Sequence, residues 1–526
     1  MTEHRGSRRR SGGRTARREL RAAGPSQADL PVYPGLTGGS YRPLGERDIE
    51  RIHKAALEVL DCIGLAEAPP RLRALALAKG CHLNDKDRLC FPSALVEDLV
   101  AGAAHEIVLH ARDPARDLEI GGRRVHYGTG GAAVKVLDPE TGRYRASRLI
   151  DLYDFARLVD CLDNVHWFTR CVIASDIEDP LELDLNTAYA CLAGTTKHIG
   201  TAITLPENVA PVIALFDQVL GGDGRFKQRP LCKLHASPIV SPLRFGADAV
   251  DVIFEAVGHG MPINAITAGQ SGATAPASLA GALVQTVAET LAALCLVNLI
   301  APGHPFIFSN WPMVSDLRTG AFSGGGGEEA VLSAGAAQMG NFYDLPSGVA
   351  AGMADSKLPD GQAGYEKALT TVLAGMAGAN LIYESSGMLA SLLGCSFETF
   401  VQDDEMLGFV LRAVRGLEVT EESLALEVIE QAATGPGHYL GSDQTLALME
   451  REYVYPKLGD RNTPDQWEQE GGTDIRARAL ERVREILGRH YPSYLDEATD
   501  RAIRSRFPIR LPRAAMHHGG AAWPRP

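Results

Sequence analysis

The sequence predicts an α/β protein whose main domain is a (β/α)8 TIM barrel, with an N-terminal α+β cap and a C-terminal helical extension. Three observations favour this fold class. Strand-like apolar runs alternate with helical patterns, polar side chains follow the ends of those runs, and the 526-residue chain contains 55 glycines but only 6% aromatic residues. Such alternation predicts a parallel sheet that binds ligands at the carboxyl ends of its strands. A doubly wound open sheet is the alternative, but no GxGxxG motif follows the first strand.

The clearest βαβ unit spans residues 346–387. Its helix carries apolar residues at the spacing of one helix face, namely Tyr365, Leu369, Val372, Leu373 and Met376. Asp360 is placed to cap the start of this helix, and Gly378 lies near its end. Acidic, basic and hydroxyl side chains follow both strands of the unit. The unit therefore places reactive groups at one edge of the predicted sheet.

Eight strands of the barrel are predicted from short apolar runs bounded by turn residues. They cover residues 166–174, 198–204, 231–239, 262–268, 305–310, 347–353, 381–385 and 399–402. Helical patterns separate most of them, at residues 183–192, 209–220, 247–257, 278–300, 328–339 and 365–377. Three further helices are expected in the cap, at residues 47–63, 70–78 and 93–101, and two at 418–432 and 475–487.

The domain boundaries follow from shifts in composition. We expect a disordered basic tail (1–41), the α+β cap (42–160), the barrel (161–415), the C-terminal helical extension (416–510) and a second disordered tail (511–526). A mitochondrial transit peptide is the alternative for the first tail, although Glu3 and Glu19 weaken it. The glycines of residues 128–131 precede a strand rather than a helix, so they do not predict a phosphate-binding loop.

Composition narrows the class of protein. The net charge is −13 although the first segment is rich in arginine, so the folded part is acidic and tight nucleic-acid binding is disfavoured. Residues 279–300 are apolar but contain Gln285, Glu289 and Asn298, which predicts a core helix and no membrane span. The nine cysteines form no CxxC pair. Buried free thiols in the cytoplasm, without a structural metal, are the simplest interpretation.

Several stretches together resemble the trimethylamine methyltransferase (MttB) superfamily. They read AGQSGATAPASLAGALVQTVAETLA, GGGGEEAVLSAGAAQMGNFYDLPSG, ADSKLPDGQAGYEKALT and GPGHYLGSDQTLALMEREYVYPKLGDR, in that order along the chain. The resemblance implies a barrel that passes a methyl group from a methylated amine to the cobalt of a separate corrinoid protein, and therefore no tightly bound cofactor of its own. This chain holds only standard residues. It resembles the non-pyrrolysine branch, which implies quaternary amines such as glycine betaine as substrates.

A site for a quaternary amine needs aromatic faces for the cation and a donor for any carboxylate of the substrate. Near the strand ends, the candidates for the cation are Trp311, Phe308 and Tyr383, each of which is alternatively a packing aromatic of the barrel rim. The polar candidates are His235, Gln270 and Asn310, which are alternatively structural hydrogen-bonding residues. Asp355, Lys357 and Glu384 are the candidate catalytic residues, with at least one carboxylate expected to pair with Lys357.

Two other functions remain open on the sequence alone. One is a barrel that binds quaternary amines without catalysis, and the other is a cobalamin-independent lyase or hydrolase that uses Asp355, Lys357 and Glu384 as acid and base. The acidic run Asp403 to Glu405 is expected to be a solvated loop and not a metal site. Apolar faces on the cap and terminal helices suggest a homo-oligomer.

Overall fold

The structure is a computed structural model that describes residues 30–519 and residue 523, so most of the first predicted tail and part of the second lie outside the described residues. The chain forms two compact units. One contains Pro34–Arg415 and Pro456–Pro526, and the other contains Met1–Tyr33 and Gly416–Tyr455. The described part of the second unit includes the helices α14 (Leu426–Thr434) and α15 (Asp443–Leu448).

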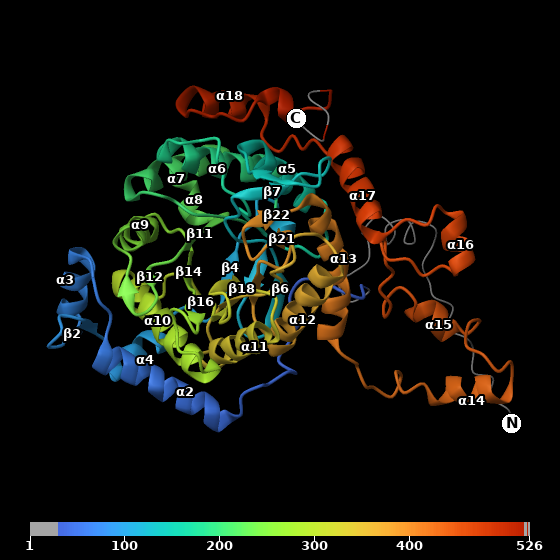
Figure 1. The fold of residues 1–526 in the computed structure, drawn as a ribbon, viewed down its shortest axis with the longest axis horizontal. Helices are drawn as coiled ribbons and strands as arrows, with labels where there is room; N and C mark the ends of the chain where they lie inside the picture. The colour runs from blue at the N-terminus through green and yellow to red at the C-terminus, as the bar shows by residue number, and fades with distance from the viewer. Residues whose placement is uncertain (1–29, 520–522, 524–526) are drawn as a thin grey trace, which may run out of the picture. The chain divides into compact units, whose positions relative to one another are not determined.

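The larger unit is built on a curled nine-stranded sheet with helices around it (Figure 1). Its order is β1 (Leu36–Thr37), β6 (Arg124–Tyr127), β20 (Leu381–Tyr383), β19 (Ser347–Ala350), β16 (Phe306–Asn310), β14 (Ile263–Thr267), β11 (Cys232–Ala236), β10 (Ile199–Thr201) and β9 (Phe168–Thr169). All neighbouring pairs are parallel except β1 with β6. A parallel bridge also joins Gly128, just after β6, to Trp167, just before β9.

Seven of the eight predicted strands overlap strands of this sheet, but the eighth prediction was wrong. Residues 399–402 lie within the helix α13 (Phe397–Arg415). Apolar residues recur there at helical spacing, namely Phe397, Phe400, Val401, Leu407, Val410, Leu411 and Val414, and all are buried. The remaining parallel strand is β6, which the sequence placed in the cap because it precedes the strand-helix alternation. It pairs with β20.

Helices surround the sheet, and six of them match predicted positions. These are α6 (Pro180–Gly194), α7 (Val209–Val219), α9 (Ala247–Gly258), α10 (Leu279–Ile300), α11 (Gly327–Phe342) and α12 (Gly361–Ala377). The other two were not predicted as helices in this place: α5 (Leu149–Asp160) lies in the segment assigned to the cap, and α13 includes the residues predicted as the eighth strand. Asp360 caps α12 by accepting from the backbone N–H of Ala363, and Gly378 ends it with a φ of 86°. By length and composition alone α10 qualifies as a membrane span, but 83% of its apolar window is buried inside the protein. It is the core helix expected from the sequence.

An N-terminal segment packs against one end of the sheet. It contains the predicted helices, α2 (Glu46–Glu58), α3 (Pro70–Ala78) and α4 (Ser93–Ala101), and a hairpin of β4 (Ile107–Leu109) and β5 (Leu118–Ile120). The carbonyl of Thr196, which precedes β10, accepts from the N–H of Arg112, and the carbonyl of Asp344, which precedes β19, contacts the His105 ring at 2.7 Å. This segment therefore covers the amino ends of the parallel strands.

Two small sheets follow the carboxyl ends of the strands. One consists of β15 (Gln270–Ser271), β17 (Met313–Asp316) and β18 (Ala321–Ser323), and the other of β21 (Met388–Leu389), β22 (Gly394–Cys395), β7 (Lys135–Leu137) and β8 (Tyr144–Ala146). Asp355 joins them, because its carboxylate accepts from Ser323 of β18 in the first sheet and from Ser391 within the β21–β22 hairpin.

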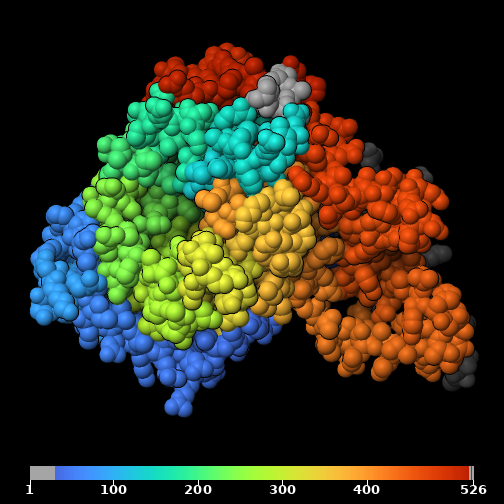
Figure 2. Space-filling view, viewed as in Figure 1, coloured from blue at the N-terminus to red at the C-terminus, as the bar shows by residue number. Residues whose placement is uncertain are grey.

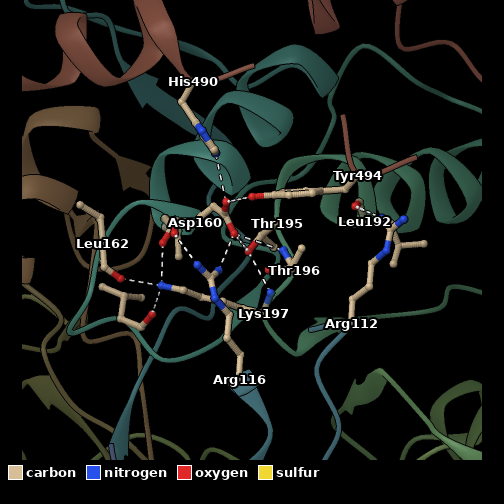
Figure 3. Close-up of polar contacts among 12 residues, drawn as sticks. Arg112, Arg116, Asp160, Leu162, Leu192, Thr195, Thr196, Lys197, His490 and Tyr494 are labelled. Carbon is tan, nitrogen blue, oxygen red and sulfur yellow. Dashed lines mark hydrogen bonds and ion pairs between the residues drawn. The ribbon is translucent and has the colours of Figure 1, made fainter. Parts of the chain in front are cut away.

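Helices near the C-terminus, α17 (Ile475–Arg489) and α18 (Glu497–Arg506), pack on α5 and α7. Asp160, at the end of α5, accepts from His490 at 3.0 Å, from Tyr494 and from Arg116 at 2.6 Å (Figure 3). This buried carboxylate therefore fixes the segment after α17 to the body of the larger unit.

Candidate active site

Buried aromatic rings meet inside the curled sheet at the carboxyl ends of its strands. The ring of Tyr383, the last residue of β20, lies 5.2 Å from that of Trp167, 5.3 Å from that of Trp311 and 5.6 Å from that of His235 between centroids. We call these four residues the aromatic cluster. The molecular face in Figure 2 is hollowed near its centre, next to the green segment that includes β11 in Figure 1. Aromatic faces are thus gathered at the end of the sheet where ligands bind.

Glycines make room for these rings. A Cβ atom on Gly128 would lie 2.2 Å from the Trp167 ring, and one on Gly348 would lie 2.3 Å from the Ser309 hydroxyl and 3.1 Å from the Tyr383 ring. Gly128 forms a parallel bridge with Trp167, and Gly348 pairs with Ser309 of β16 and Leu381 of β20. Small residues opposite large ones let the indole and phenol rings lie across the interior.

Buried polar atoms around the cluster have no hydrogen-bond partner among the residues that the structure describes. Buried polar groups are normally paired, so a concentration of unpaired ones marks a site that a ligand or water completes. The unpaired atoms are Trp167 Nε1, Thr169 Oγ1, Lys233 Nζ, both side-chain polar atoms of Asn310, Trp311 Nε1, the Tyr383 hydroxyl and both carboxylate oxygens of Glu384. These residues lie in β9, β11, β16 and β20 or directly next to them. Trp167, Thr169, Lys233, Trp311 and Tyr383 come from these four strands to one interior space.

A hydrogen-bond chain fixes His235. The Ser309 hydroxyl donates to the amide oxygen of Asn264, and the Asn264 amide nitrogen lies 3.0 Å from His235 Nδ1. Since the amide oxygen already accepts, we assign the amide nitrogen as donor and Nδ1 as acceptor, which leaves the proton on Nε2. Burial, Arg170 and Lys233 hold the pKa of His235 well below its usual range. His235 is therefore a neutral imidazole that donates from Nε2.

Glu384 is held in a strained backbone conformation with a φ of 62°. Its side chain is fully buried, and a Cβ atom on Gly130 or Gly131 would lie 2.8 Å from one or the other carboxylate oxygen. The glycines of residues 128–131 thus form a backbone cradle for a carboxyl group. Burial raises the pKa of Glu384 to about 8, although Lys367 and Arg170 oppose the shift. The positive charges of Lys367 and Arg170 therefore do not suffice to keep the Glu384 carboxyl group ionised at neutral pH.

Two predicted catalytic residues lie in the loops that frame the site. Burial raises the pKa of Asp355, but hydrogen bonds from Gly324, Ser323 and Ser391 outweigh it and leave the pKa below the ordinary value. Lys357 is exposed, and its ammonium donates to the Asp355 carbonyl at 2.7 Å rather than to a carboxylate. The structure therefore separates Lys357 from Glu384. Asp355 instead holds the loop at Gly324 by accepting from its backbone N–H at 2.9 Å.

The other predicted contacts divide between the site and its surroundings. His235, Trp311 and Tyr383 belong to the aromatic cluster. Asn310 is buried with both side-chain polar atoms unpaired, but it is two residues after Phe308 on β16 and therefore faces the same side of the strand as Phe308. Gln270 accepts from the Ser315 hydroxyl at 3.0 Å within the first small sheet. The Phe308 ring contacts Tyr343 next to α11, at 5.5 Å between centroids, because alternation along β16 directs it away from Ile307 and Ser309. Phe308 is not brought to the site.

Comparison with known proteins decides the family. The family model described as "Trimethylamine methyltransferase (MTTB)" matches residues 10–511. This chain belongs to the MTTB family. A trimethylamine methyltransferase of Desulfitobacterium hafniense is 33% identical over 472 residues, with 90% of this chain and 93% of that protein covered. A glycine betaine methyltransferase of the same species is 29% identical, with 88% and 96% covered. The MTTB chain is accordingly a methyltransferase.

A solved relative is the Methanosarcina barkeri monomethylamine methyltransferase, with 15% sequence identity and a TM-score of 0.47. The superposition covers 85% of the MTTB chain and 95% of that structure. The trimethylamine methyltransferase of Methanosarcina barkeri is 33% identical over 470 residues, with 88% of the MTTB chain and 94% of that protein covered.

Sequence reasoning missed Lys233, Trp167 and Asn264 of the MTTB site. Lys233 and His235 are two residues apart on β11, so they face the same side of the sheet, and this spacing was available in the sequence. Trp167 precedes the short strand β9 and Asn264 lies inside β14, where a single polar residue in an apolar run gave no distinct signal.

The acidic run Asp403 to Glu405, which follows the eighth predicted strand, is helical and not a solvated loop. Asp403 of α13 forms a buried ion pair with Lys367 at 3.1 Å, Asp404 accepts from Asn164, and Glu405 accepts from backbone N–H groups of residues 457–459. No group of three or more His, Cys, Asp or Glu suited to a metal occurs among the residues that the structure describes. The expected absence of a metal stays a prediction.

Proposed function

We propose that this MTTB-family enzyme transfers a methyl group from a quaternary amine to the Co(I) of a separate corrinoid protein. The observation that carries the proposal is the aromatic cluster beside the buried Glu384. Trp311, Tyr383 and Trp167 present electron-rich faces, and a permanently charged trimethylammonium group is attracted to such faces without needing hydrogen bonds. Standard residues throughout the chain fit the non-pyrrolysine branch suggested by its motifs.

The residues of the site act by binding and orientation. A quaternary amine leaves as a neutral amine, so no proton has to be delivered to its nitrogen. The enzyme must hold the cation with one N-methyl group toward the open end of the sheet and exclude water. The rings of Trp311 and Tyr383 lie 5.3 Å apart between centroids, and both side chains are buried. They therefore provide two rigid aromatic surfaces that can hold the cation in one orientation.

Glu384 supplies the counter-charge. Without a cation, burial favours its protonated form, as the raised pKa indicates. A quaternary ammonium close to the carboxyl group favours ionisation, so substrate binding and the loss of this proton are linked. The Gly130 and Gly131 backbone keeps both oxygens free of other side-chain partners for that contact.

The corrinoid protein, when bound, supplies the Co(I) nucleophile. The corrinoid protein must reach the substrate from one end of the barrel interior. The end between the two small sheets is suited to this, because the cap covers the other end through β4 and β5. Asp355 is proposed as a positioning residue that fixes these sheets. Lys357 as a catalytic residue, a homo-oligomeric state and a cytoplasmic location stay predictions.

We also propose that the sheet closes into a complete (β/α)8 barrel. Its support is the bridge between Gly128 and Trp167, together with the 2.7 Å hydrogen bond from the His166 N–H to the Tyr127 carbonyl. These contacts join the β6 and β9 ends of a run of eight parallel strands. Closure places Tyr383, Trp167 and Lys233 around one interior instead of along an open edge.

The proposed function is tested by mixing the enzyme with a panel of quaternary and tertiary amines and reduced cob(I)alamin. Methyl transfer consumes Co(I), which is followed by absorbance. Trp311→Leu is expected to slow the reaction, while Trp467→Leu, at an exposed tryptophan, serves as the matched control. Tight amine binding without Co(I) consumption favours the binding barrel. A product formed without cobalamin, and lost in Lys357→Ala, favours the lyase or hydrolase.

A further inference from the structure

Lys233 is the only one of three fully buried or nearly buried lysines in the described residues whose ammonium has no hydrogen-bond acceptor. Lys197 donates to the carbonyls of Val159, Leu162 and Val165 (Figure 3). Lys367 donates to the Gly352 carbonyl at 2.5 Å and pairs with Asp403. Lys233 Nζ has no hydrogen-bond partner in the described part of the chain and lies over the rings of Trp167 and Tyr383, at 5.4 and 5.5 Å from their centroids. The described part of the fold thus provides hydrogen-bond acceptors for the ammonium groups of Lys197 and Lys367 but none for that of Lys233.

We propose that Lys233 binds the carboxylate of the substrate, which makes the substrate a zwitterion with a carboxylate and a quaternary nitrogen in one molecule. This assignment rests on the proposed function. A buried cation without an anion is unfavourable, whereas a carboxylate placed against it forms a charge-assisted hydrogen bond. The titratable groups that interact with Lys233 in the described part of the chain are Cys232, His198 and His235, and none is a carboxylate.

The position of Lys233 along β11 sets the orientation of the substrate. It precedes His235 by two residues, so it lies about 6–7 Å farther from the carboxyl end of the strand. The anionic end is therefore held deep in the interior, and the trimethylammonium group lies nearer the open end, beside Trp311 and Glu384. This direction presents an N-methyl group outward, as transfer to an external acceptor requires.

A second donor lies at the same depth. In the sheet, Gly200 pairs with Thr169 on one side and with Lys233 on the other, so the three residues form one row. Gly200 has no side chain to separate its neighbours, and the Thr169 hydroxyl is buried without a partner. A carboxylate with two oxygens can accept from both Lys233 and Thr169. The row therefore forms an anion site from residues already in place.

Binding calorimetry on the full chain tests the assignment with two ligands that share a trimethylammonium group. Glycine betaine carries a carboxylate, and choline carries a hydroxyl instead. We expect the wild type to bind glycine betaine more tightly than choline, and Lys233→Met to weaken glycine betaine binding about 100-fold while leaving choline binding unchanged. Lys54→Met, at an exposed lysine of α2, is the matched control and should change neither affinity.

The outcomes separate this assignment from the proposed function. Equal affinity of the wild type for the two ligands, or equal weakening of both by Lys233→Met, overturns the role of Lys233. If choline binding depends on Trp311 but glycine betaine binds no more tightly than choline, the proposed function is retained and the role of Lys233 is rejected. If neither ligand nor tetramethylammonium binds, both fail. The wild-type comparison holds even if Lys233→Met does not fold, although an apolar isostere of an unpaired lysine should keep its melting temperature.

Discussion

The amide nitrogen of Asn264 lies 3.0 Å from Nδ1 of His235, and this contact fixes the imidazole beside the aromatic cluster. Because Asn264 donates, His235 carries its proton on Nε2. Replacing the amide with a carboxylate in Asn264→Asp supplies an acceptor and should move the proton to Nδ1. Nitrogen NMR of labelled histidine reports the tautomer directly. An Nδ1-protonated ring in the wild type, or no change in the variant, contradicts the assigned network.

Trp311 should contribute directly to cation binding. Trp311→Leu removes one aromatic wall and is expected to weaken tetramethylammonium binding about 5- to 30-fold, which corresponds to about 1–2 kcal/mol for a desolvated cation–π contact. Tyr383→Phe keeps the ring and should change the affinity little. Calorimetric titration measures both. If Tyr383→Phe weakens binding more than Trp311→Leu does, the hydroxyl rather than the ring faces carry recognition.

Glu384 should release a proton when a cation binds. Its pKa of about 8 in the empty site means that it is mostly protonated at pH 7, and a bound cation lowers that pKa. Tetramethylammonium binding at pH 7 is therefore expected to release up to one proton, seen as a buffer-dependent binding enthalpy. Glu384→Gln has no proton to lose, so the buffer dependence should vanish.

The same shift affects stability. Glu384 has a higher pKa folded than unfolded, so the folded state binds more protons between about pH 4.5 and 8. The contribution of this group to stability therefore falls as pH rises through that range. The free energy of unfolding of the wild type, relative to Glu384→Gln, should decrease from pH 5 to pH 8. A flat difference would show that the carboxyl group is solvated.

His490 should stabilise the protein in a pH-dependent way. Its hydrogen bond to Asp160 raises its pKa to about 9. The stabilisation is complete below the unfolded pKa of about 6.5 and is lost as pH rises through about 9. His490→Gln is expected to cost about 1–2 kcal/mol at pH 6 and less at pH 10, measured by urea unfolding. His82→Gln, at an exposed histidine, is the control, and an identical profile for both variants contradicts the account.

Gly348 should not tolerate a side chain. Alanine there places a Cβ atom against Ser309 and the Tyr383 ring, so Gly348→Ala is expected to destabilise the fold by about 1–3 kcal/mol and to weaken cation binding. Gly364→Ala is the matched control in α12, where a Cβ atom meets nothing within 4 Å. That control should be neutral or stabilising by up to about 1 kcal/mol, because alanine favours a helix. Thermal unfolding and calorimetry measure the two effects.

Sequence pattern predicted the parallel strands and their helices well, because period and turn residues specify such elements locally. It failed where pairing is long-range. β6 joins β20 across more than 250 residues, and no local pattern distinguishes that pairing from a cap hairpin. Residues 399–402 form a run that is too short to distinguish a strand from a helix. Only the spacing of apolar residues as far as Val414 shows that the segment is helical.

The site was predictable only in part for a similar reason. Trp311 and Tyr383 lie at the carboxyl ends of two predicted strands. Because such ends meet at one edge of a parallel sheet, the sequence predicted that these two residues lie close together. Lys233 was missed because a lysine in a strand is usually solvated. What sets it apart is that its ammonium has no acceptor among the residues that the structure describes. The exposure of Lys357 depends on how the loop after β19 folds, which the sequence does not specify locally.

The central claim is tested most directly by following the methyl group. Enzyme, reduced cob(I)alamin and glycine betaine labelled with ¹³C in its N-methyl groups are mixed, and the demethylated amine is counted by NMR against the Co(I) consumed. The account predicts dimethylglycine and lost Co(I) in equal amounts, with both reduced in Trp311→Leu. Dimethylglycine formed without Co(I), or no demethylation of any quaternary amine that binds, would contradict it.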